Sequence, residues 1–302
     1  MVRHFLEVDD LDRDELEAVL ALAAAPSLPR VLEGRGAALL FEKPSARTRN
    51  SMEMAVVQLG GHPVTIRDEE VGLDVRETVE DVTRILHSYH AVIAARVFQH
   101  RMLERMAAVA RVPVVNLLSD AGHPMQALAD VLTMRQVLGD VAGRRVAYVG
   151  DGNNVCRSLV LAAGMVGMHV AVATPAGYEP SAGDQDRFRR AGVDVLITEK
   201  PAEAVEGADV VYTDAWYYMG QEAEANERRP VFRPYQVNTE LMALAAPGAV
   251  FLHCLPAHRG DEVTNEVLDS AASQVWAQAE NRMHAARGLL AWILQASGGG
   301  AA

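Results

Sequence analysis

The sequence predicts an α/β protein with two doubly wound domains, each built on a parallel sheet. Short apolar segments alternate with helical segments along the chain, which is the pattern of repeated strand–helix–strand units. Most of the apolar segments lack polar alternation, as expected for parallel strands that are covered on both faces. A length of 302 residues accommodates about two such domains. A last amphipathic helix is expected at about residues 280–295.

The apolar segments fall into two sets. The first predicts strands at residues 37–41, 64–66, 91–95 and 112–117. The second predicts strands at residues 145–150, 169–173, 193–197, 208–213 and 249–253. The segment 139–143 separates the two sets, so one domain is expected at residues 1–138 and a second at 139–279. Open α/β sheets bind ligands beyond the carboxyl ends of their strands, and candidate site residues are sought there.

The composition disfavours several classes of protein. With 28 Lys and Arg against 40 Asp and Glu, the net charge of −12 argues against nonspecific nucleic-acid binding. No apolar segment is long enough to cross a membrane, and the first ten residues carry acids where a signal peptide has bases. Cys156 and Cys254 lie far apart without metal-ligand spacing. We therefore expect a cytoplasmic protein with reduced thiols, no metal, no cofactor, and no nucleic-acid or membrane partner.

An anion site is predicted after the strand at residues 37–41. Ser45 suits the N-cap of the following helix, which places Arg47 and Arg49 in or near its first turn. Basic residues have the wrong sign for the positive end of a helix dipole, unless an anion binds there. The alternative is that both arginines pair with nearby acids on a solvated face.

Two further segments place polar side chains at strand ends of the first domain. His123 and Gln126 flank the start of a helix at Pro124, from which a histidine can donate to a carbonyl and a glutamine can bind an amide-like group. Arg96 follows the strand at residues 91–95. The alternatives are capping and packing for His123 and a surface ion pair for Arg96.

A glycine loop follows the strand at residues 145–150 in the second domain. The sequence Gly150-Asp151-Gly152-Asn153-Asn154 begins like a dinucleotide fingerprint, but Val155 replaces the third glycine and no acid ends the next strand. A nicotinamide-dependent oxidoreductase is therefore a disfavoured alternative. The asparagines could bind a carboxylate through their amides or, alternatively, form the turn and cap the helix.

Two other strand ends of the second domain carry reactive groups. Asp214 follows the strand at residues 208–213 and could hold an ammonium group; the alternative is a helix cap. Cys254 follows the strand at residues 249–253, where a ligand would bind, although a free cysteine is often a small buried apolar residue. Arg282 lies in the last predicted helix.

Together these segments resemble the aspartate/ornithine carbamoyltransferase family and, within it, the ornithine branch. The matching motifs occur in family order over nearly the whole chain, at residues 41–49 (FEKPSARTR), 123–126 (HPMQ), 150–154 (GDGNN), 214–220 (DAWYYMG), 253–256 (HCLP) and 280–282 (ENR). The aspartate branch typically has His-Pro-Leu-Pro-Arg at the fifth of these and a lysine in the loop that here spans residues 67–74, which contains none.

The resemblance implies transfer of the carbamoyl group of carbamoyl phosphate to the δ-amine of L-ornithine, giving L-citrulline and phosphate in arginine biosynthesis or catabolism. It implies that residues 1–138 bind carbamoyl phosphate and that the C-terminal helix, about residues 280–302, packs back on this domain. It assigns ornithine binding to residues 139–279. It also implies a homotrimer with shared active sites.

The resemblance also assigns residues to each step. The phosphate is expected to bind Ser45, Ala46, Arg47, Thr48, Arg96 and Arg282, and the carbamoyl group to bind His123, Gln126 and the carbonyls of Cys254 and Leu255. The amino acid is expected to bind Asn154, Asp214, Met219 and Tyr218. The catalytic groups are then Asp214 and Cys254 near the reacting amine, with Arg96 and His123 meeting the charge on the carbonyl oxygen. The Leu255–Pro256 peptide bond is expected to be cis.

Three positions depart from the family pattern. Ala46 replaces a threonine, and Tyr218 replaces a serine that contacts the α-amino group of ornithine. Glu70 falls where a neutral residue would reach the carbamoyl phosphate of a neighbouring subunit. These departures leave two alternatives: a carbamoyltransferase for another amine, such as putrescine or a modified ornithine, and a noncatalytic ligand-binding relative.

Overall fold

The computed structural model describes residues 2–217 and 222–297, which form two compact units. Unit 1 comprises residues 1–132 and 280–302, and unit 2 comprises residues 133–279. Both boundaries fall inside helices, namely α6 (Pro124–Leu138) and α13 (Val275–Ala296). The first boundary thus precedes the glycine-containing segment 139–143 at which the sequence suggested a break.

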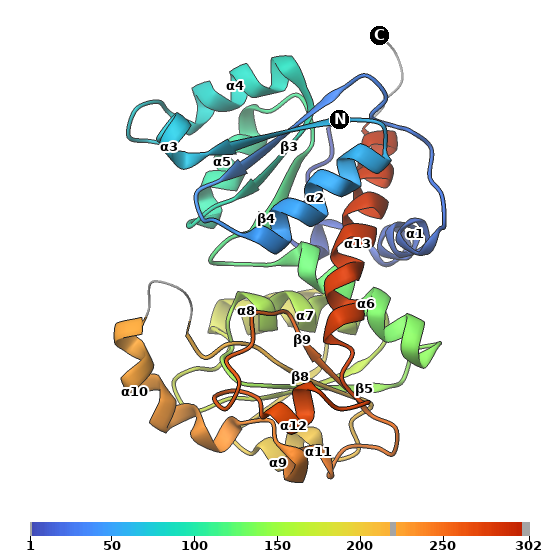
Figure 1. Ribbon diagram of the computed structural model, residues 1–302, viewed down its shortest axis with the longest axis vertical. Helices are drawn as coiled ribbons and strands as arrows, with labels where there is room; N and C mark the ends of the chain where they lie inside the picture. Colours follow the sequence, from blue (N-terminus) through green and yellow to red (C-terminus); the bar gives the residue numbers. More distant parts are fainter. Residues whose placement is uncertain (1, 218–221, 298–302) are drawn as a thin grey trace. The chain divides into compact units, whose positions relative to one another are not determined.

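Unit 1 contains a four-stranded parallel sheet with the strand order β2-β1-β3-β4 (Figure 1). Its strands are β1 (Gly36–Phe41), β2 (His62–Arg67), β3 (His90–Arg96) and β4 (Val114–Leu118). Its other elements are η1 (Val8–Asp10), α1 (Arg13–Ala24), α2 (Ala46–Gln58), α3 (Asp68–Val71), α4 (Val79–Tyr89) and α5 (His100–Val109). The order β2-β1-β3 means that the chain reverses direction across the sheet after β2, and such a switch point creates a ligand crevice at the strand ends.

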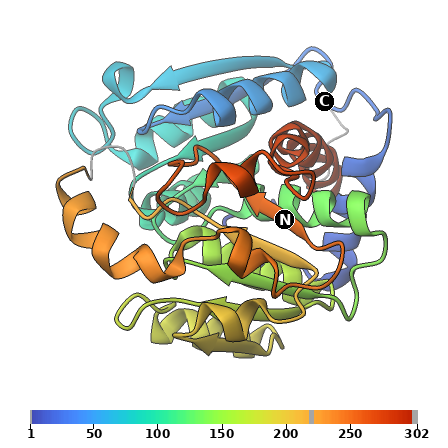
Figure 2. The same cartoon turned by 60° about the horizontal axis from the view of Figure 1, so that its bottom comes forward.

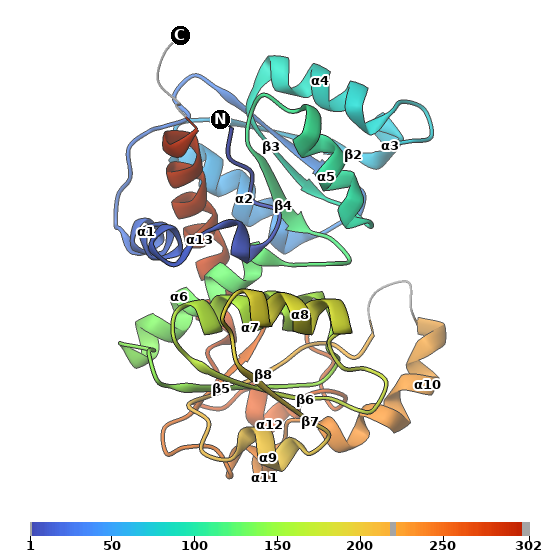
Figure 3. The same ribbon diagram turned by 180° about the vertical axis from the view of Figure 1, so that it is seen from behind.

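The helices of unit 1 cover both faces of this sheet. Figures 1 and 3 show α4 and α5 together on one face and α2 on the other. Strand residues such as Leu40 and Ile93 pack with Leu86 of α4 and Leu103 of α5 in one apolar core. In α13, Gly288 lies against α1, where a side-chain carbon would approach the backbone nitrogen of Ala23 to 2.5 Å. The expectation that the C-terminal helix packs on the first domain is confirmed.

Unit 2 contains a five-stranded parallel sheet with the strand order β7-β6-β5-β8-β9. Its strands are β5 (Arg145–Val149), β6 (His169–Ala173), β7 (Val195–Thr198), β8 (Val210–Thr213) and β9 (Val250–His253). Its helices are α7 (Asn154–Met165), α8 (Ala182–Arg190), α9 (Pro201–Val205), α10 (Glu222–Phe232), η2 (Arg233–Tyr235), α11 (Thr239–Met242) and α12 (Asn265–Leu268). Figure 2 shows α10, in orange, at one edge of the unit.

The predicted fold class is confirmed in both units. Every expected strand is present, and its ends lie within two residues of the predicted ones. Strand residues of unit 2, such as Val149, Ala171 and Phe251, are buried, as continuous apolar strands require. None of the helices among the described residues combines the length and the apolar character that a membrane span demands.

Candidate active site

The start of α2 in unit 1 brings several predicted phosphate ligands together. Ser45 is the N-cap, and its Oγ accepts a hydrogen bond from the backbone N–H of Thr48 at 3.3 Å. Thr48, only 2% exposed, lies on the buried side of this first turn. Its Oγ1 lies 3.1 Å from Ser45 Oγ, 3.3 Å from a guanidinium nitrogen of Arg282 and 3.5 Å from one of Arg96. Arg96 at the end of β3 and Arg282 in α13 therefore meet at the N-terminus of α2.

Gln126 fixes the position of the second arginine. Its Oε1 accepts a hydrogen bond from Arg282, and its Nε2 donates to Asp130 at 2.8 Å. All three side chains are buried. Because the acceptor end of the amide faces Arg282, the orientation of Gln126 is determined by its neighbours. Charge-assisted contacts of this kind hold the guanidinium in place before any ligand binds.

The electrostatics of this cluster are those of an anion site. His123 precedes α6 and is 5% exposed; burial, together with Arg282 and Arg96, lowers its pKa well below the usual 6.5. The imidazole is therefore neutral at pH 7 and has one N–H to donate. Burial and the neighbouring Arg96 also lower the pKa of Lys43, which lies over the ring of Phe98. Burial is the larger cause of both shifts, and the positive charge of Arg96 adds to it in each case, although Asp120 and Glu42 partly oppose the shift of Lys43.

The two arginines of the first α2 turn behave differently. Arg49 pairs with Glu53 at 2.8 Å, so the ion-pair alternative applies to this residue. Arg47 and Ala46 are exposed in the same turn, and Arg47 makes no hydrogen bond or ion pair within the part of the chain that the structure describes. Glu70 acts as a cap, because its Oε2 accepts the backbone N–H of Arg67 at 3.0 Å at the start of α3.

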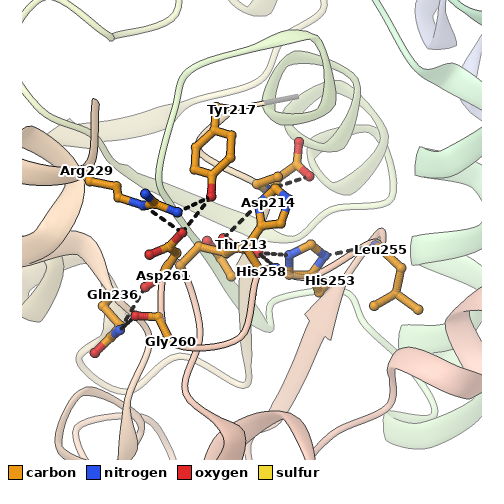
Figure 4. Close-up of polar contacts among 12 residues, drawn as sticks. Thr213, Asp214, Tyr217, Arg229, Gln236, His253, Leu255, His258, Gly260 and Asp261 are labelled. Carbon is orange, nitrogen blue, oxygen red and sulfur yellow. Dashed lines mark hydrogen bonds and ion pairs between the residues drawn. The ribbon is translucent and has the colours of Figure 1, made fainter. Parts of the chain in front are cut away.

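In unit 2, the carboxylate of Asp214 lies at the end of β8 and is 2% exposed. Its Oδ1 accepts the N–H of Ala215 at 2.8 Å and the thiol of Cys254 at 2.9 Å. Its Oδ2 accepts from Nδ2 of Asn153 at 3.0 Å. Since β8 and β9 are neighbours, their carboxyl ends bring Asp214 and Cys254 together. Figure 4 shows Asp214 near His253, the last residue of β9.

The segment after β9 is fixed by a buried histidine. His253 Nδ1 accepts the N–H of Leu255 at 2.8 Å, and Nε2 lies 3.1 Å from Oε1 of Glu262. Because Nδ1 accepts, the proton belongs on Nε2, where it faces the carboxylate. Leu255 has a φ of 57° and its bond to Pro256 is cis, as expected. This backbone turns sharply at the residue whose carbonyl was assigned to the carbamoyl group.

The glycine loop of unit 2 has a structural explanation. A side-chain carbon at Gly152 would lie 2.4 Å from the backbone nitrogen of Pro180, so only glycine fits there. Val155, which stands in place of the third glycine of a dinucleotide fingerprint, is a buried residue of α7. Asn153 caps α7 by accepting two backbone N–H groups, while the predicted ligand Asn154 is the partly exposed first residue of that helix. The structure therefore gives no support to a nicotinamide site in this loop.

Some functional residues were missed by sequence reasoning, and others cannot be placed. Asn153 and Glu262 were not predicted as partners of Asp214 and His253, because their roles depend on contacts between separate loops. Tyr218 and Met219, the other predicted ornithine ligands, lie outside the described residues.

One group of side chains has the composition of a metal site. Ligand atoms of Asp214, His253 and Cys254 lie within 4.8 Å of one another. Both ring nitrogens of His253 are already hydrogen bonded, however, so metal binding there would break an existing contact.

Comparison with known proteins agrees with this arrangement. Residues 3–136 match the family model "Aspartate/ornithine carbamoyltransferase, carbamoyl-P binding domain", and residues 142–293 match "Aspartate/ornithine carbamoyltransferase, Asp/Orn binding domain". The chain is 48% identical to an ornithine carbamoyltransferase from Hyperthermus butylicus, over 97% of each chain. It is 49% identical to the anabolic ornithine carbamoyltransferase of Pyrococcus furiosus, over 88% of this chain and 85% of the relative.

Solved structures lead to the same result. The ornithine carbamoyltransferase structure from Pyrococcus furiosus superimposes with a TM-score of 0.90 at 45% identity, covering 96% of each chain. Both sequence and fold thus match over nearly the full length. The chain belongs to the aspartate/ornithine carbamoyltransferase family.

Proposed function

We propose that the protein is an ornithine carbamoyltransferase, which transfers the carbamoyl group of carbamoyl phosphate to the δ-amine of L-ornithine and releases L-citrulline and phosphate. The observation that carries this proposal is the meeting of Arg96 and Arg282 at the hydroxyl of Thr48, on the N-terminus of α2. Two guanidinium groups and a helix N-terminus at one hydroxyl form a site for a doubly charged phosphate.

Carbamoyl phosphate is the substrate that we assign to unit 1. Its phosphate group binds Ser45, Ala46, Arg47, Thr48, Arg96 and Arg282, and its carbamoyl group binds His123, Gln126 and the carbonyls of Cys254 and Leu255. Gln126 is held by Arg282 and Asp130, which supports a fixed orientation. Arg47 is exposed in the first turn of α2, where its guanidinium is available to an incoming anion.

L-Ornithine is the substrate that we assign to unit 2. Asn154, Tyr218 and Met219 bind the amino acid, and Asp214 and Cys254 lie beside the reacting amine. An ammonium group has no lone pair, and the pKa of a free alkyl ammonium is about 10.4, so the amine must lose a proton before it attacks. The Asp214 carboxylate attracts the ammonium and is positioned to accept that proton, directly or through the thiol 2.9 Å away.

Negative charge then develops on the carbonyl oxygen of the carbamoyl group. Arg96 and His123 are the donors that meet this charge. The lowered pKa of His123 leaves it a neutral donor that keeps its proton. A preorganised donor of this type contributes roughly 3 kcal/mol to the stabilisation of such a transition state. The phosphate leaves into the arginine cluster from which it was delivered.

The remaining expectations complete this proposal. We assign the protein to the cytoplasm, to arginine biosynthesis and to a homotrimer with shared active sites. The biosynthetic direction is supported by the name of the anabolic relative from Pyrococcus furiosus. Sedimentation analysis would test the trimer, for which a mass of about three times 32.7 kDa is expected.

The decisive experiment is an assay of product formation with carbamoyl phosphate and a panel of amines. L-Ornithine should give L-citrulline and phosphate in equal amounts, faster than putrescine, N-acetyl-L-ornithine or L-aspartate gives its product. Product from another amine but not from ornithine would reject the assignment of the substrate. Binding of both compounds without turnover would identify a noncatalytic relative instead.

A further inference from the structure

The Asp214–Cys254 pair lies where two chain segments leave the sheet, directly after the paired strand residues Thr213 and His253. One segment, residues 214–217, follows β8, and the other, residues 254–262, follows β9. The 2.9 Å contact between the thiol and the carboxylate is itself weak, because sulfur is a weak hydrogen-bond donor. The strand pairing fixes the starts of the two segments, and the geometry of the pair depends further on what holds the segments together beyond the strand ends.

A closed triangle of hydrogen bonds links the far ends of these segments. The phenol of Tyr217 donates to Oδ2 of Asp261 at 2.8 Å and accepts from a guanidinium nitrogen of Arg229 at 2.7 Å. Arg229 closes the triangle by donating to the same carboxylate oxygen at 3.1 Å (Figure 4). The ring of Tyr217 also stacks on His258, with centroids 4.6 Å apart and 9° between the planes.

The turn that carries Asp261 is anchored independently of Tyr217. Arg233 donates to the carbonyl of Gly260 at 3.0 Å, and Gln236 donates to the carbonyls of Gly260 and Asp261, both at 2.8 Å. Arg233 lies in η2 and Gln236 directly follows it, so these hydrogen bonds hold the turn in place within unit 2 without Tyr217. The hydrogen bond from the Tyr217 phenol to Asp261 therefore connects the segment that carries Asp214 to this turn.

The Tyr217 phenol has the protonation state that a hydrogen-bond donor to Asp261 needs. Tyr217 is 8% exposed, and burial followed by the neighbouring Asp261 raises the pKa of its hydroxyl. It therefore remains a protonated donor throughout the neutral range. The hydrogen bonds of the phenol go to Asp261 and Arg229, neither of which has a role in the chemistry assigned above.

We propose that Tyr217 is a positioning residue, which holds the segment after Asp214 against the turn after Cys254 and so maintains the hydrogen-bonded geometry of the Asp214–Cys254 pair. This inference rests on the proposed function only for its kinetic consequence. Its structural consequence, the state of the Cys254 thiol, is independent of which amine the enzyme uses.

The test compares Tyr217→Phe with a matched control, Tyr235→Phe. Tyr235 is 6% exposed and its phenol also donates one hydrogen bond, to the carbonyl of Glu199 at 2.7 Å, away from the pair. Both variants keep the aromatic ring and lose one buried hydroxyl. A general loss of stability should therefore affect them alike.

Two readouts are needed. The first is the rate at which iodoacetamide alkylates Cys254, followed on its peptide by mass spectrometry; Cys156 is fully buried, and burial raises its pKa, so it serves as an unreactive internal reference. The second is steady-state kinetics with both substrates. Loss of a hydrogen bond of this kind corresponds to roughly a fivefold change in either readout.

In Tyr217→Phe we expect about fivefold faster alkylation of Cys254, because the thiol is less often held by Asp214, and about fivefold higher KM for ornithine with an unchanged KM for carbamoyl phosphate. Tyr235→Phe should leave all three values at the wild-type level. Arg229→Met removes the two hydrogen bonds that Arg229 donates to Asp261 and Tyr217, and it should raise the alkylation rate and the KM for ornithine in the same direction. Because Arg229 is more exposed, this variant tests the positioning role if Tyr217→Phe does not fold.

An alkylation rate in Tyr217→Phe no different from that in Tyr235→Phe would overturn the inference, whatever happens to KM. Faster alkylation in an enzyme that does not carbamoylate ornithine would retain the positioning role and reject the proposed function.

Discussion

The candidate sites of the two units have opposite charge. In unit 1, burial lowers the pKa of His123, and the positive charges of Arg282 and Arg96 lower it further. In unit 2, burial raises the pKa of Cys156, and the acids Asp151, Asp184 and Asp214 raise it further. The first site attracts an anion and keeps its imidazole neutral, whereas the second attracts a cation and keeps its neighbouring groups protonated.

The two sites also differ in how they are assembled. The unit 1 cluster draws on segments more than 200 residues apart in sequence, since the hydroxyl of Thr48 meets the guanidinium of Arg282. The unit 2 site draws on neighbouring strand ends, and its carboxylate already has three hydrogen-bond donors. The difference shows that a phosphate site can be left with exposed charge, such as Arg47, while a proton-transfer site requires every partner to be fixed beforehand.

The largest effect is expected from Asp214→Asn, which keeps the shape of the side chain and removes its charge. The kcat/KM for ornithine should fall on the order of 10³-fold, because the variant neither attracts the ammonium nor accepts its proton. The KM for carbamoyl phosphate should change little. Steady-state kinetics with each substrate varied in turn would check this, and a loss shared equally by both substrates would remove the distinction between the two sites.

Arg47→Ala should weaken carbamoyl phosphate binding by roughly 10²-fold, the value of a charge-assisted contact to phosphate. Because Arg47 is exposed, the melting temperature should not change. Arg49→Ala is the matched control, since Arg49 lies in the same helix but pairs with Glu53 at the surface. Isothermal titration would compare the two variants, and equal losses would show that general positive charge, rather than a site, binds the phosphate.

Cys254→Ser should lower kcat about tenfold, because a hydroxyl is a poorer partner than a thiol for moving a proton near neutral pH. The serine retains a donor for Asp214, so ornithine should still bind. Initial rates at saturating concentrations of both substrates would measure the effect. A kcat equal to that of the wild type would assign Cys254 to packing alone.

His123→Asn should change how the free energy of unfolding depends on pH. The unfolded imidazole takes up a proton below its pKa of about 6.5, whereas the folded one does so only at lower pH, so the folded protein loses stability as pH falls below about 6.5. Urea denaturation between about pH 7.5 and pH 5 should show a decline that is smaller in the variant, by on the order of 1 kcal/mol. His169→Asn, at an exposed position, is the control and should decline like the wild type.

Much of the fold could be predicted because most strands are continuous apolar segments with polar residues at their ends, although β2 contains Thr65 and β4 contains Asn116. The sequence also placed Arg96 and Asp214 correctly at the carboxyl ends of β3 and β8. The start of α2 was located by its capping residue: Ser45 suited the N-cap position, and the helix begins at Ala46 directly after it. Serine is a preferred N-cap residue, so this boundary could be recognised from the residue type alone.

Contacts between loops could not be predicted from the sequence. The pairing of Asn153 with Asp214, and of Tyr217 with Asp261, depends on which strands are neighbours and how far each loop reaches. The pairing of Arg49 with Glu53, by contrast, follows from helical spacing of four residues and was available as an alternative. Local spacing therefore predicts local pairs, whereas the strand order β5-β8-β9 is needed for the rest.

The most direct test is the titration of carbamoyl phosphate into two variants, Arg282→Met and Asp214→Asn, beside the wild type. Binding should be lost in Arg282→Met, which removes the guanidinium that contacts Thr48 and Gln126, and should match the wild type in Asp214→Asn. Wild-type affinity in Arg282→Met, or equal losses in both variants, would contradict the assignment of the phosphate to unit 1.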